Sequence, residues 1–314
     1  MKVSVIIPFF NMQEYILDCL NSVEDQKYRE IEVICVNDGS TDESQKIVEE
    51  FILSSNLEIK LINQDNLGAP KARNFALKHS KGDYIQFLDA DDILLPMKIE
   101  NQIKLVKENN FPDLIIGSYK SIDLKTNLIS KTTYNPVFNY NLWENLMDTN
   151  LGNTCSNLFK NSIFKNNIKW DETLQSSQEY NLMFELLQNR ISIIFDSQIN
   201  TIIRIRKYGS ISKTNVVKKW ETYVDLRSRI ISYLISNKPD ILNDRLIQSF
   251  FSKIRILYPY NPKLASTYYK DFFSNNFIPK RSFNNSRIYI LLYKIFGFYI
   301  TERIKLFVKR INYK

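Results

Sequence analysis

The chain has 314 residues, 44% hydrophobic and 24% charged, so it is long enough for two lobes and apolar enough to bury their cores. Its three cysteines are odd in number and scattered, which excludes a disulfide framework and a cysteine-based zinc site and suits a reducing cytoplasm. The single histidine excludes any site that needs two imidazoles. No apolar run reaches the roughly 18 residues of a spanning helix, and no cleavable secretory signal is expected.

The first hundred residues alternate predicted strands and helices. The predicted strands are 3–7, 31–36, 58–62 and 84–88, and helices are predicted to follow them, beginning near residues 16, 40, 69 and 96. Ser40 and Glu43 have the spacing of a capping box, which predicts a helix start at Ser40. This alternation predicts a parallel sheet, which binds ligands at the carboxyl ends of its strands.

Three carboxylates, Asp89, Asp91 and Asp92, follow the predicted strand 84–88. At neutral pH they repel one another unless a hard divalent cation, Mg²⁺ or Mn²⁺, joins them. A solvated acidic turn that caps the next helix explains the same residues equally well.

Two further polar segments follow predicted strands. Asp38, beside a turn-forming glycine, can accept a hydrogen bond from a base N–H, or can belong to an ordinary turn. Lys71 and Arg73 open a helix, where they can meet a pyrophosphate or lie on a solvated face. No phosphate-binding P-loop and no G-x-G-x-x-G sequence occurs, which disfavours a dinucleotide site.

The pattern changes along the rest of the chain. Further strands are predicted at 113–117, 191–195 and 201–206, a helix core at 183–188, and helices at 220–236, 243–257, 264–273 and 287–311. We therefore expect a domain over residues 1–215, with halves 1–112 and 113–215, followed by a helical, basic region over 216–314.

Four motifs together resemble the family 2 glycosyltransferases of the GT-A fold. They are VSVIIPFFN at 3–11, VNDGSTD at 36–42, GAPKARN at 68–74 and YIQFLDADD at 84–92, in the usual order. The resemblance covers roughly residues 1–215 and implies a nucleotide-sugar donor, most often a UDP-sugar, a Mn²⁺ or Mg²⁺ ion, and inversion at the anomeric carbon.

The resemblance also implies roles for single residues. Pro8, Phe9 and Phe10 would line the pocket for the base, and Asp38 would bond the base. Asp89 would reach the ribose, and Asp91 would ligate the metal. Lys71 and Arg73 would neutralise phosphate charge.

Two segments depart from the family's usual pattern. Gln178 and Glu179 stand where the family usually has a Glu-Asp pair, so Glu179 is the candidate general base; a plain acid at a helix N-terminus is the alternative. Arg206 stands where relatives often carry histidine. A guanidinium stays protonated and cannot ligate a metal, so Arg206 is expected to hold a phosphate oxygen.

Two tryptophans fall in the expected acceptor half of the domain. An exposed indole can stack on a sugar ring, although a tryptophan is more often partly buried. Trp143 is expected in the core, and for Trp170 both interpretations stay open.

The C-terminal 62 residues, 253–314, carry 13 basic and only 2 acidic side chains. Apolar and basic residues alternate over 287–311 at helical spacing, which is typical of a helix on an anionic lipid surface. A helix packed on the catalytic lobe or on a second subunit is the alternative. Nothing beyond charge favours nucleic acid as a partner.

These observations favour an inverting glycosyltransferase that builds a bacterial surface glycan on a glycan or lipid-linked acceptor. We expect it in the cytoplasm or peripherally on the inner membrane. A sugar-phosphate nucleotidyltransferase is a weaker alternative, because the Gly-rich signature after the first strand is missing. Another alternative is a non-catalytic, membrane- or polyanion-binding relative; the acidic cluster and Glu179 argue against it.

Overall fold

The structure is a computed structural model that describes residues 1–133, 141–206, 215–274, 276–282 and 285–311. The chain divides into two compact units, Met1–Ser210 and Ile211–Lys314. The division lies close to the boundary expected after residue 215, in a segment outside the described residues.

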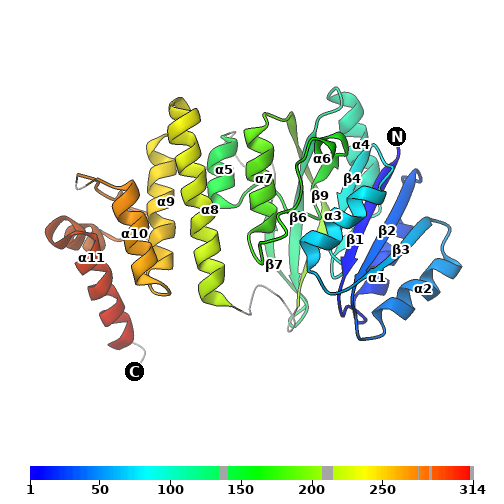
Figure 1. The fold of residues 1–314 in the computed structure, drawn as a ribbon, viewed down its shortest axis with the longest axis horizontal. Helices are drawn as coiled ribbons and strands as arrows, with labels where there is room; N and C mark the ends of the chain where they lie inside the picture. The colour runs from blue at the N-terminus through cyan, green and yellow to red at the C-terminus, as the bar shows by residue number, and fades with distance from the viewer. Residues whose placement is uncertain (134–140, 207–214, 275, 283–284, 312–314) are drawn as a thin grey trace. The chain divides into compact units, whose positions relative to one another are not determined.

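The first half of unit 1 is the predicted alternation of parallel strands and helices. Its elements are β1 (Val3–Phe9), α1 (Ile16–Glu24), β2 (Ile31–Asp38), α2 (Ser44–Ser54), β3 (Glu58–Gln64), α3 (Ala69–His79) and β4 (Tyr84–Phe87). β1 pairs in parallel with both β2 and β4, and β2 pairs in parallel with β3, so these strands lie side by side (Figure 1). Their carboxyl ends therefore share one edge of the sheet.

The second half of unit 1 makes the sheet mixed. Its elements are β5 (Ile93–Leu94), α4 (Lys98–Glu108), β6 (Leu114–Asp123), β7 (Leu128–Thr133), α5 (Leu142–Asp148), β8 (Leu158–Lys160), α6 (Ser162–Lys165), α7 (Gln178–Gln188) and β9 (Ile193–Ile205). The strand order is β3-β2-β1-β4-β8-β6-β9-β5, with β7 on β6 and with β8 antiparallel to β4 and β6. The two strands predicted at 191–195 and 201–206 are wrong as separate elements, because β9 runs through both.

The core explains why the first strands read as continuous apolar runs. Every residue of β1 and β2 is buried, as expected for strands covered on both faces. Cys19, Cys35 and Cys155 are all free and buried among apolar side chains. The fold is the α/β sheet with flanking helices that the sequence predicts.

The capping box predicted at Ser40 is wrong. α2 begins four residues later at Ser44, and its N-cap residue, Glu43, makes no capping side-chain bond. Ser40 instead accepts a hydrogen bond from the backbone N–H of Asn11 through its Oγ. A tertiary contact with the end of β1 replaces the local capping bond.

Unit 2 is helical, as predicted. Its elements are α8 (Val216–Asn237), a 3₁₀ turn (Pro239–Ile241), α9 (Asp244–Leu257), α10 (Pro262–Phe272) and α11 (Arg287–Ile311). The aromatic rings of Phe251, Tyr269 and Phe298 pack together between α9, α10 and α11. Within the described residues, no helix combines the length and the apolar character that crossing a bilayer requires.

Candidate active site at the carboxyl edge of the sheet

Three carboxylates gather in one turn directly after β4. The backbone N–H of Asp92 donates to the carbonyl of Asp89 at 2.9 Å, which closes the turn and holds the intervening Asp91 beside them. Asp92 is buried, and Asp91 and Asp89 are partly exposed. The turn lies at the edge where β1 and β2 also end, so the sheet brings together the polar segments that the sequence placed after each strand.

Two arginines from other elements face this turn. Arg73 of α3 places Nη2 2.5 Å from Oδ1 of Asp89, and Arg206, just after β9, places Nε 2.6 Å from Oδ2 of Asp91. Arg204 donates its backbone N–H to Oδ1 of Asp92 at 2.8 Å and its Nε–H to the carbonyl of Asp91. No role for Arg204 is predicted from the sequence, although its position two residues before Arg206 in extended chain places both side chains on the same face.

Burial disfavours the ionised forms of Asp91 and Asp92. It raises the pKa of Asp91, and the carboxylate of Asp89 raises it further, while Arg206 lowers it. Burial and the two neighbouring carboxylates likewise raise the pKa of Asp92 well above its ordinary value. A cation beside the turn would relieve this repulsion.

Glu179 lies in the first turn of α7 and belongs to the same site. Burial raises the pKa of its carboxyl to about 8, and the negative charge of Asp89 raises it as well, against hydrogen bonds from Thr154 and the charge of Arg73 that lower it. Its Oε1 is buried and has no hydrogen-bond partner among the described residues. A carboxylate with an unused acceptor oxygen and a pKa near neutrality is suited to accept a proton.

Arg73 connects α3 to the start of α7. Its guanidinium lies 4.5 Å from the ring centre of Trp170, and its Nη1 donates to Oε1 of Gln178 at 3.4 Å. Trp170 is 1% exposed and packs edge-on against Phe87, so the sugar-stacking interpretation of this tryptophan is wrong. Trp143 is buried as well, as expected.

Pro8, Phe9 and Phe10, which were expected to line the pocket for the nucleotide base, differ in their exposure to solvent. Pro8 and Phe9 are buried, and Phe9 is part of the hydrophobic core, because its side chain points to the face of β1 that α1 covers. Phe10 is 38% exposed. Of the two phenylalanines, only Phe10 offers a ring face to a ligand.

Asp38 is already engaged with protein atoms. Its carboxylate accepts hydrogen bonds from Nε2 of Gln64 at 2.7 Å and from the backbone N–H groups of Leu67 and Gly68 at 2.8 and 2.9 Å. Because Gly68 is the N-cap of α3, these bonds position the helix that carries Lys71 and Arg73. Lys71 has no ion-pair partner among the described residues.

The oxygen donors at this edge fit a hard divalent cation. Ligand atoms of Asp89, Asp92 and Cys155 lie within 4.8 Å of one another, while the carboxylate of Asp91 lies outside this group and pairs with Arg206. Burial raises the pKa of Cys155 well above its ordinary value, so that residue stays a neutral thiol and donates to Oδ2 of Asp92 at 3.2 Å. The remaining donors are carboxylate oxygens, which Mg²⁺ and Mn²⁺ prefer.

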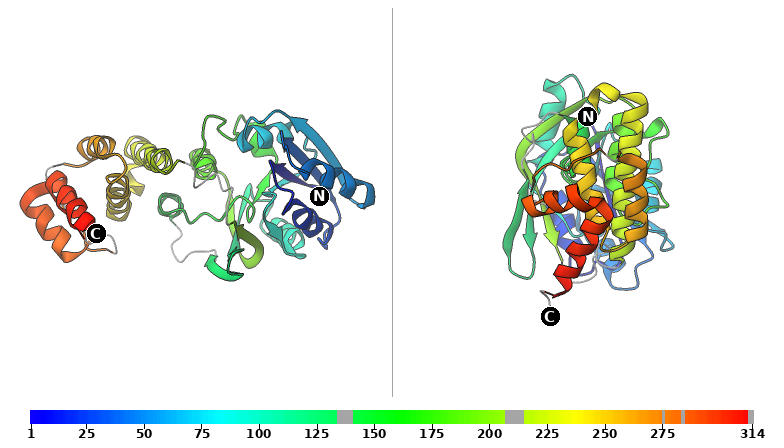
Figure 2. Two further views of the ribbon diagram at one scale, coloured as in Figure 1. Left: turned by 90° about the horizontal axis from the view of Figure 1, so that it is seen from below. Right: turned by 90° about the vertical axis from the view of Figure 1, so that its left-hand side faces the viewer.

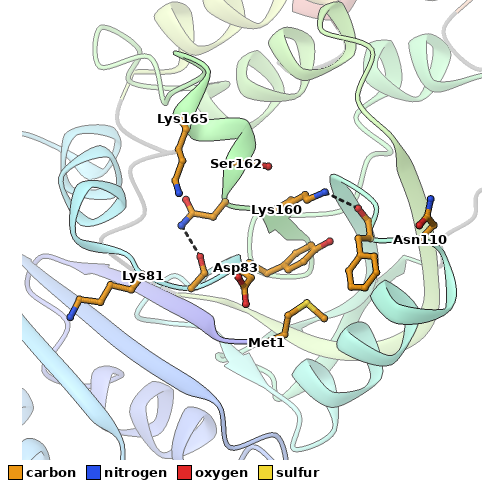
Figure 3. Close-up of a pocket in the computed structure, with 11 residues that line it drawn as sticks. Met1, Lys81, Asp83, Asn110, Lys160, Ser162 and Lys165 are labelled. Atoms are coloured by element: carbon orange, nitrogen blue, oxygen red, sulfur yellow. Dashed lines mark hydrogen bonds between the residues drawn. The ribbon is translucent and has the colours of Figure 1, made fainter.

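A separate pocket of about 630 Å³ lies at the opposite, amino edge of the sheet (Figure 3). Its polar groups serve the fold: Lys160 donates to the carbonyl of Phe111, and Asn161 donates to that of Gly82. None of the site residues predicted from the sequence lines it. The candidate active site is therefore the carboxyl edge.

Comparison with known proteins shows the family of the chain. The sequence pattern of the Glycosyl transferase family 2 matches residues 4–168, more than half of the chain, and the protein belongs to this family. Glycosyltransferase GlyA of Streptococcus pneumoniae is 31% identical over 246 residues, which are 74% of this chain and 34% of GlyA. A teichoic acid poly(glycerol phosphate) polymerase of Staphylococcus epidermidis is 27% identical over 91% of this chain and 37% of its own. The chain thus spans about a third of the length of these relatives.

Solved structures share the fold. S. aureus TarS 1–349, in complex with UDP-GlcNAc, has a TM-score of 0.62 and 22% identity over 88% of this chain and 74% of its own. The mannosyltransferase PcManGT of Pyrobaculum calidifontis, in complex with GDP-Man and Mn²⁺, has a TM-score of 0.54 and 16% identity over 97% of this chain and 86% of its own. The α/β sheet of this protein is therefore of the GT-A type.

Proposed function

We propose that the protein is an inverting glycosyltransferase that transfers a sugar from a nucleotide-sugar, most simply a UDP-sugar, to an acceptor hydroxyl. The observation that carries the proposal is Glu179. Its carboxyl is buried, has one oxygen without a hydrogen-bond partner, and has a raised pKa to which the charge of Asp89 contributes. A proton acceptor beside an acidic, arginine-lined turn is what transfer from a diphosphate donor needs.

The donor would bind over the carboxyl ends of β1, β2 and β4. Phe10 offers its exposed ring to the base, with buried Pro8 and Phe9 shaping the strand end beneath it. Asp38 would turn one carboxylate oxygen to the base while still holding Gly68. The UDP-GlcNAc bound to TarS and the GDP-Man bound to PcManGT support a nucleoside diphosphate sugar as the donor class.

Asp91 would hold a Mn²⁺ or Mg²⁺ ion, and Asp89 would reach the ribose. When bound, the ion supplies positive charge that stabilises the departing diphosphate. Lys71, Arg73 and Arg206 add fixed positive charge at the same edge. The guanidinium of Arg206 would then interact with both Asp91 and a phosphate oxygen.

The transfer itself is a single displacement. Glu179 takes the proton of the acceptor hydroxyl as the oxygen bonds to the anomeric carbon of the sugar. The bond from that carbon to the phosphate oxygen breaks at the same time, and its electron pair leaves with the nucleoside diphosphate. Attack from the face opposite the leaving group inverts the anomeric centre.

We further propose that the acceptor is a glycan or a lipid-linked glycan of the bacterial surface, modified on the cytoplasmic side of the membrane. The relatives support this class: one of them is named as a teichoic acid polymerase. A lipid-linked acceptor also accounts for the basic C-terminal region, because the enzyme and its acceptor then share an anionic membrane surface.

A donor panel tests the proposal. Purified protein with Mn²⁺ is offered several UDP- and GDP-sugars, with and without acceptor glycans, while release of free nucleotide is followed. We expect release with one donor, lost on chelation and reduced at least about 100-fold in Asp91→Ala, since such electrostatic stabilisation is worth several kcal/mol. Turnover and donor affinity unchanged in Asp91→Ala would refute the proposed site.

A further inference from the structure

The helix α11 carries an apolar surface that the rest of unit 2 leaves uncovered. Six of its large side chains, Ile288, Leu291, Ile295, Phe296, Ile300 and Phe307, are 46–71% exposed, and we call them the outer face of α11. Exposed apolar groups scattered singly are ordinary, but so many of them within one short segment of the chain mark an interaction site.

The opposite side of α11 is firmly packed. Phe298 stacks on Tyr269 of α10 with ring centres 4.1 Å apart, and Glu302 pairs with Arg255 of α9 at 2.5 Å, where both side chains are buried. The helix is thus anchored to unit 2 by its inner face. The orientation of the outer face follows from this packing.

Charge on the outer face has one sign. Arg287, Lys294 and Arg303 are exposed beside the apolar row. The only acidic residue of α11 is Glu302, which is buried in its pair with Arg255. Apolar side chains flanked by uncompensated basic ones complement a surface that is negatively charged outside and apolar beneath.

The backbone shapes this face into two segments. Gly297 has φ 70° and ψ −176°, which breaks α11 into pieces before and after it, and Figures 1 and 2 show the resulting bend. Each piece presents apolar and basic side chains. Glycine adopts this left-handed φ without strain, so the sequence itself permits the bend.

We propose that the outer face of α11 binds the surface of an anionic lipid bilayer. Its apolar side chains enter the boundary between headgroups and acyl chains, and Arg287, Lys294 and Arg303 contact the headgroup phosphates. This goes beyond sugar transfer, and its test uses no donor and no turnover.

Vesicle sedimentation tests the proposal with the full chain. Vesicles of 70% phosphatidylcholine and 30% phosphatidylglycerol are compared with pure phosphatidylcholine at 100 and 500 mM NaCl. We expect the protein to sediment with the anionic vesicles, to remain largely free with the neutral ones, and to bind more weakly at high salt.

Two variants separate the apolar from the basic contribution. Leu291→Gln/Ile295→Gln and Arg287→Gln/Lys294→Gln are each expected to weaken partitioning about tenfold or more. The control variants, Leu53→Gln on α2 and Lys46→Gln/Lys104→Gln on α2 and α4, alter exposed side chains away from α11 and should leave partitioning unchanged. Thermal unfolding confirms that each variant is folded.

Three results would overturn the proposal. The first is no sedimentation with anionic vesicles, and the second is equal weakening by the control variants. The third is a dimer in solution that becomes a monomer in Leu291→Gln/Ile295→Gln while vesicle binding is absent, because the outer face would then be a subunit interface.

Discussion

Two glutamates of unit 1 have pKa values shifted in opposite directions. Glu32 on β2 lies towards the amino edge of the sheet, and Glu179 lies at the active-site edge. Burial raises the pKa of Glu32, but hydrogen bonds from Ser4, Lys81 and Lys2 outweigh it and leave that pKa lowered. For Glu179 the pKa rises to about 8, because burial and the charge of Asp89 exceed what Thr154 and Arg73 supply.

The difference lies in the hydrogen-bond donors and in the stronger desolvation of Glu179. The carboxylate of Glu32 accepts from Oγ of Ser4 at 2.5 Å and from the backbone N–H of Lys81 at 2.6 Å, with Nζ of Lys2 at 3.2 Å. Glu179 keeps one oxygen unpartnered. A satisfied buried carboxylate serves the fold, whereas an unsatisfied one is available for chemistry.

Replacing Glu179 should have the largest effect on activity. Glu179→Gln keeps the size of the side chain but cannot accept a proton, so we expect kcat to fall about 10²- to 10⁴-fold. The value of kcat is measured from the rate of nucleotide release with the preferred donor and acceptor. A kcat within threefold of the wild type would remove Glu179 as the base.

The pH dependence of kcat/KM of the wild type should reflect the ionisation of Glu179. The base works only when deprotonated, so kcat/KM should rise with pH, reach half of its plateau near pH 8, and at pH 6 be roughly a hundredth of the plateau. The control is Glu32→Gln, whose profile should match that of the wild type. A rate independent of pH between 6 and 9 would break the contrast between the two glutamates.

The free energy of unfolding should change in opposite directions in Glu32→Gln and Glu179→Gln, and these effects are smaller than the expected effects on activity. Glu32→Gln should lower the free energy of unfolding by about 1–3 kcal/mol at pH 7. Since the native pKa of Glu32 is lowered, this loss is present above the unfolded pKa of about 4.3 and disappears as pH falls through the native value.

Glu179→Gln should raise stability at pH 8. The native pKa of Glu179 is raised, so the wild type loses stability as pH rises from the unfolded value towards about 8, and glutamine removes that loss. Urea unfolding at pH 4 and pH 8 measures both variants. The comparison fails if the two variants shift stability in the same direction at pH 8.

Much of the fold and part of the site could be read from the residues. The β-branched runs at 3–7 and 31–36 predicted doubly covered strands, and both are fully buried. The apolar spacing of the tail predicted its helices to within a few residues, but the single helix predicted at 287–311 is broken in two at Gly297. The acidic turn after 84–88 was visible as a cluster without any structure.

Contacts between distant segments could not be read in this way. The partners of the acidic turn, Arg73, Arg204 and Arg206, come from a helix and a strand more than a hundred residues apart in the chain. The mixed order of the sheet and the bonds of Asp38 to Gly68 likewise depend on tertiary pairing. Local periodicity carries no information about such pairings.

By itself, the sequence determined the alternating α/β lobe, the helical basic region and the acidic turn, because burial patterns and turn residues are local properties. Only the tertiary structure decided which glutamate has its hydrogen bonds satisfied and which keeps an oxygen without a hydrogen-bond partner. Burial and hydrogen-bond donors set the pKa of a carboxyl, and both are supplied by residues far away in the chain.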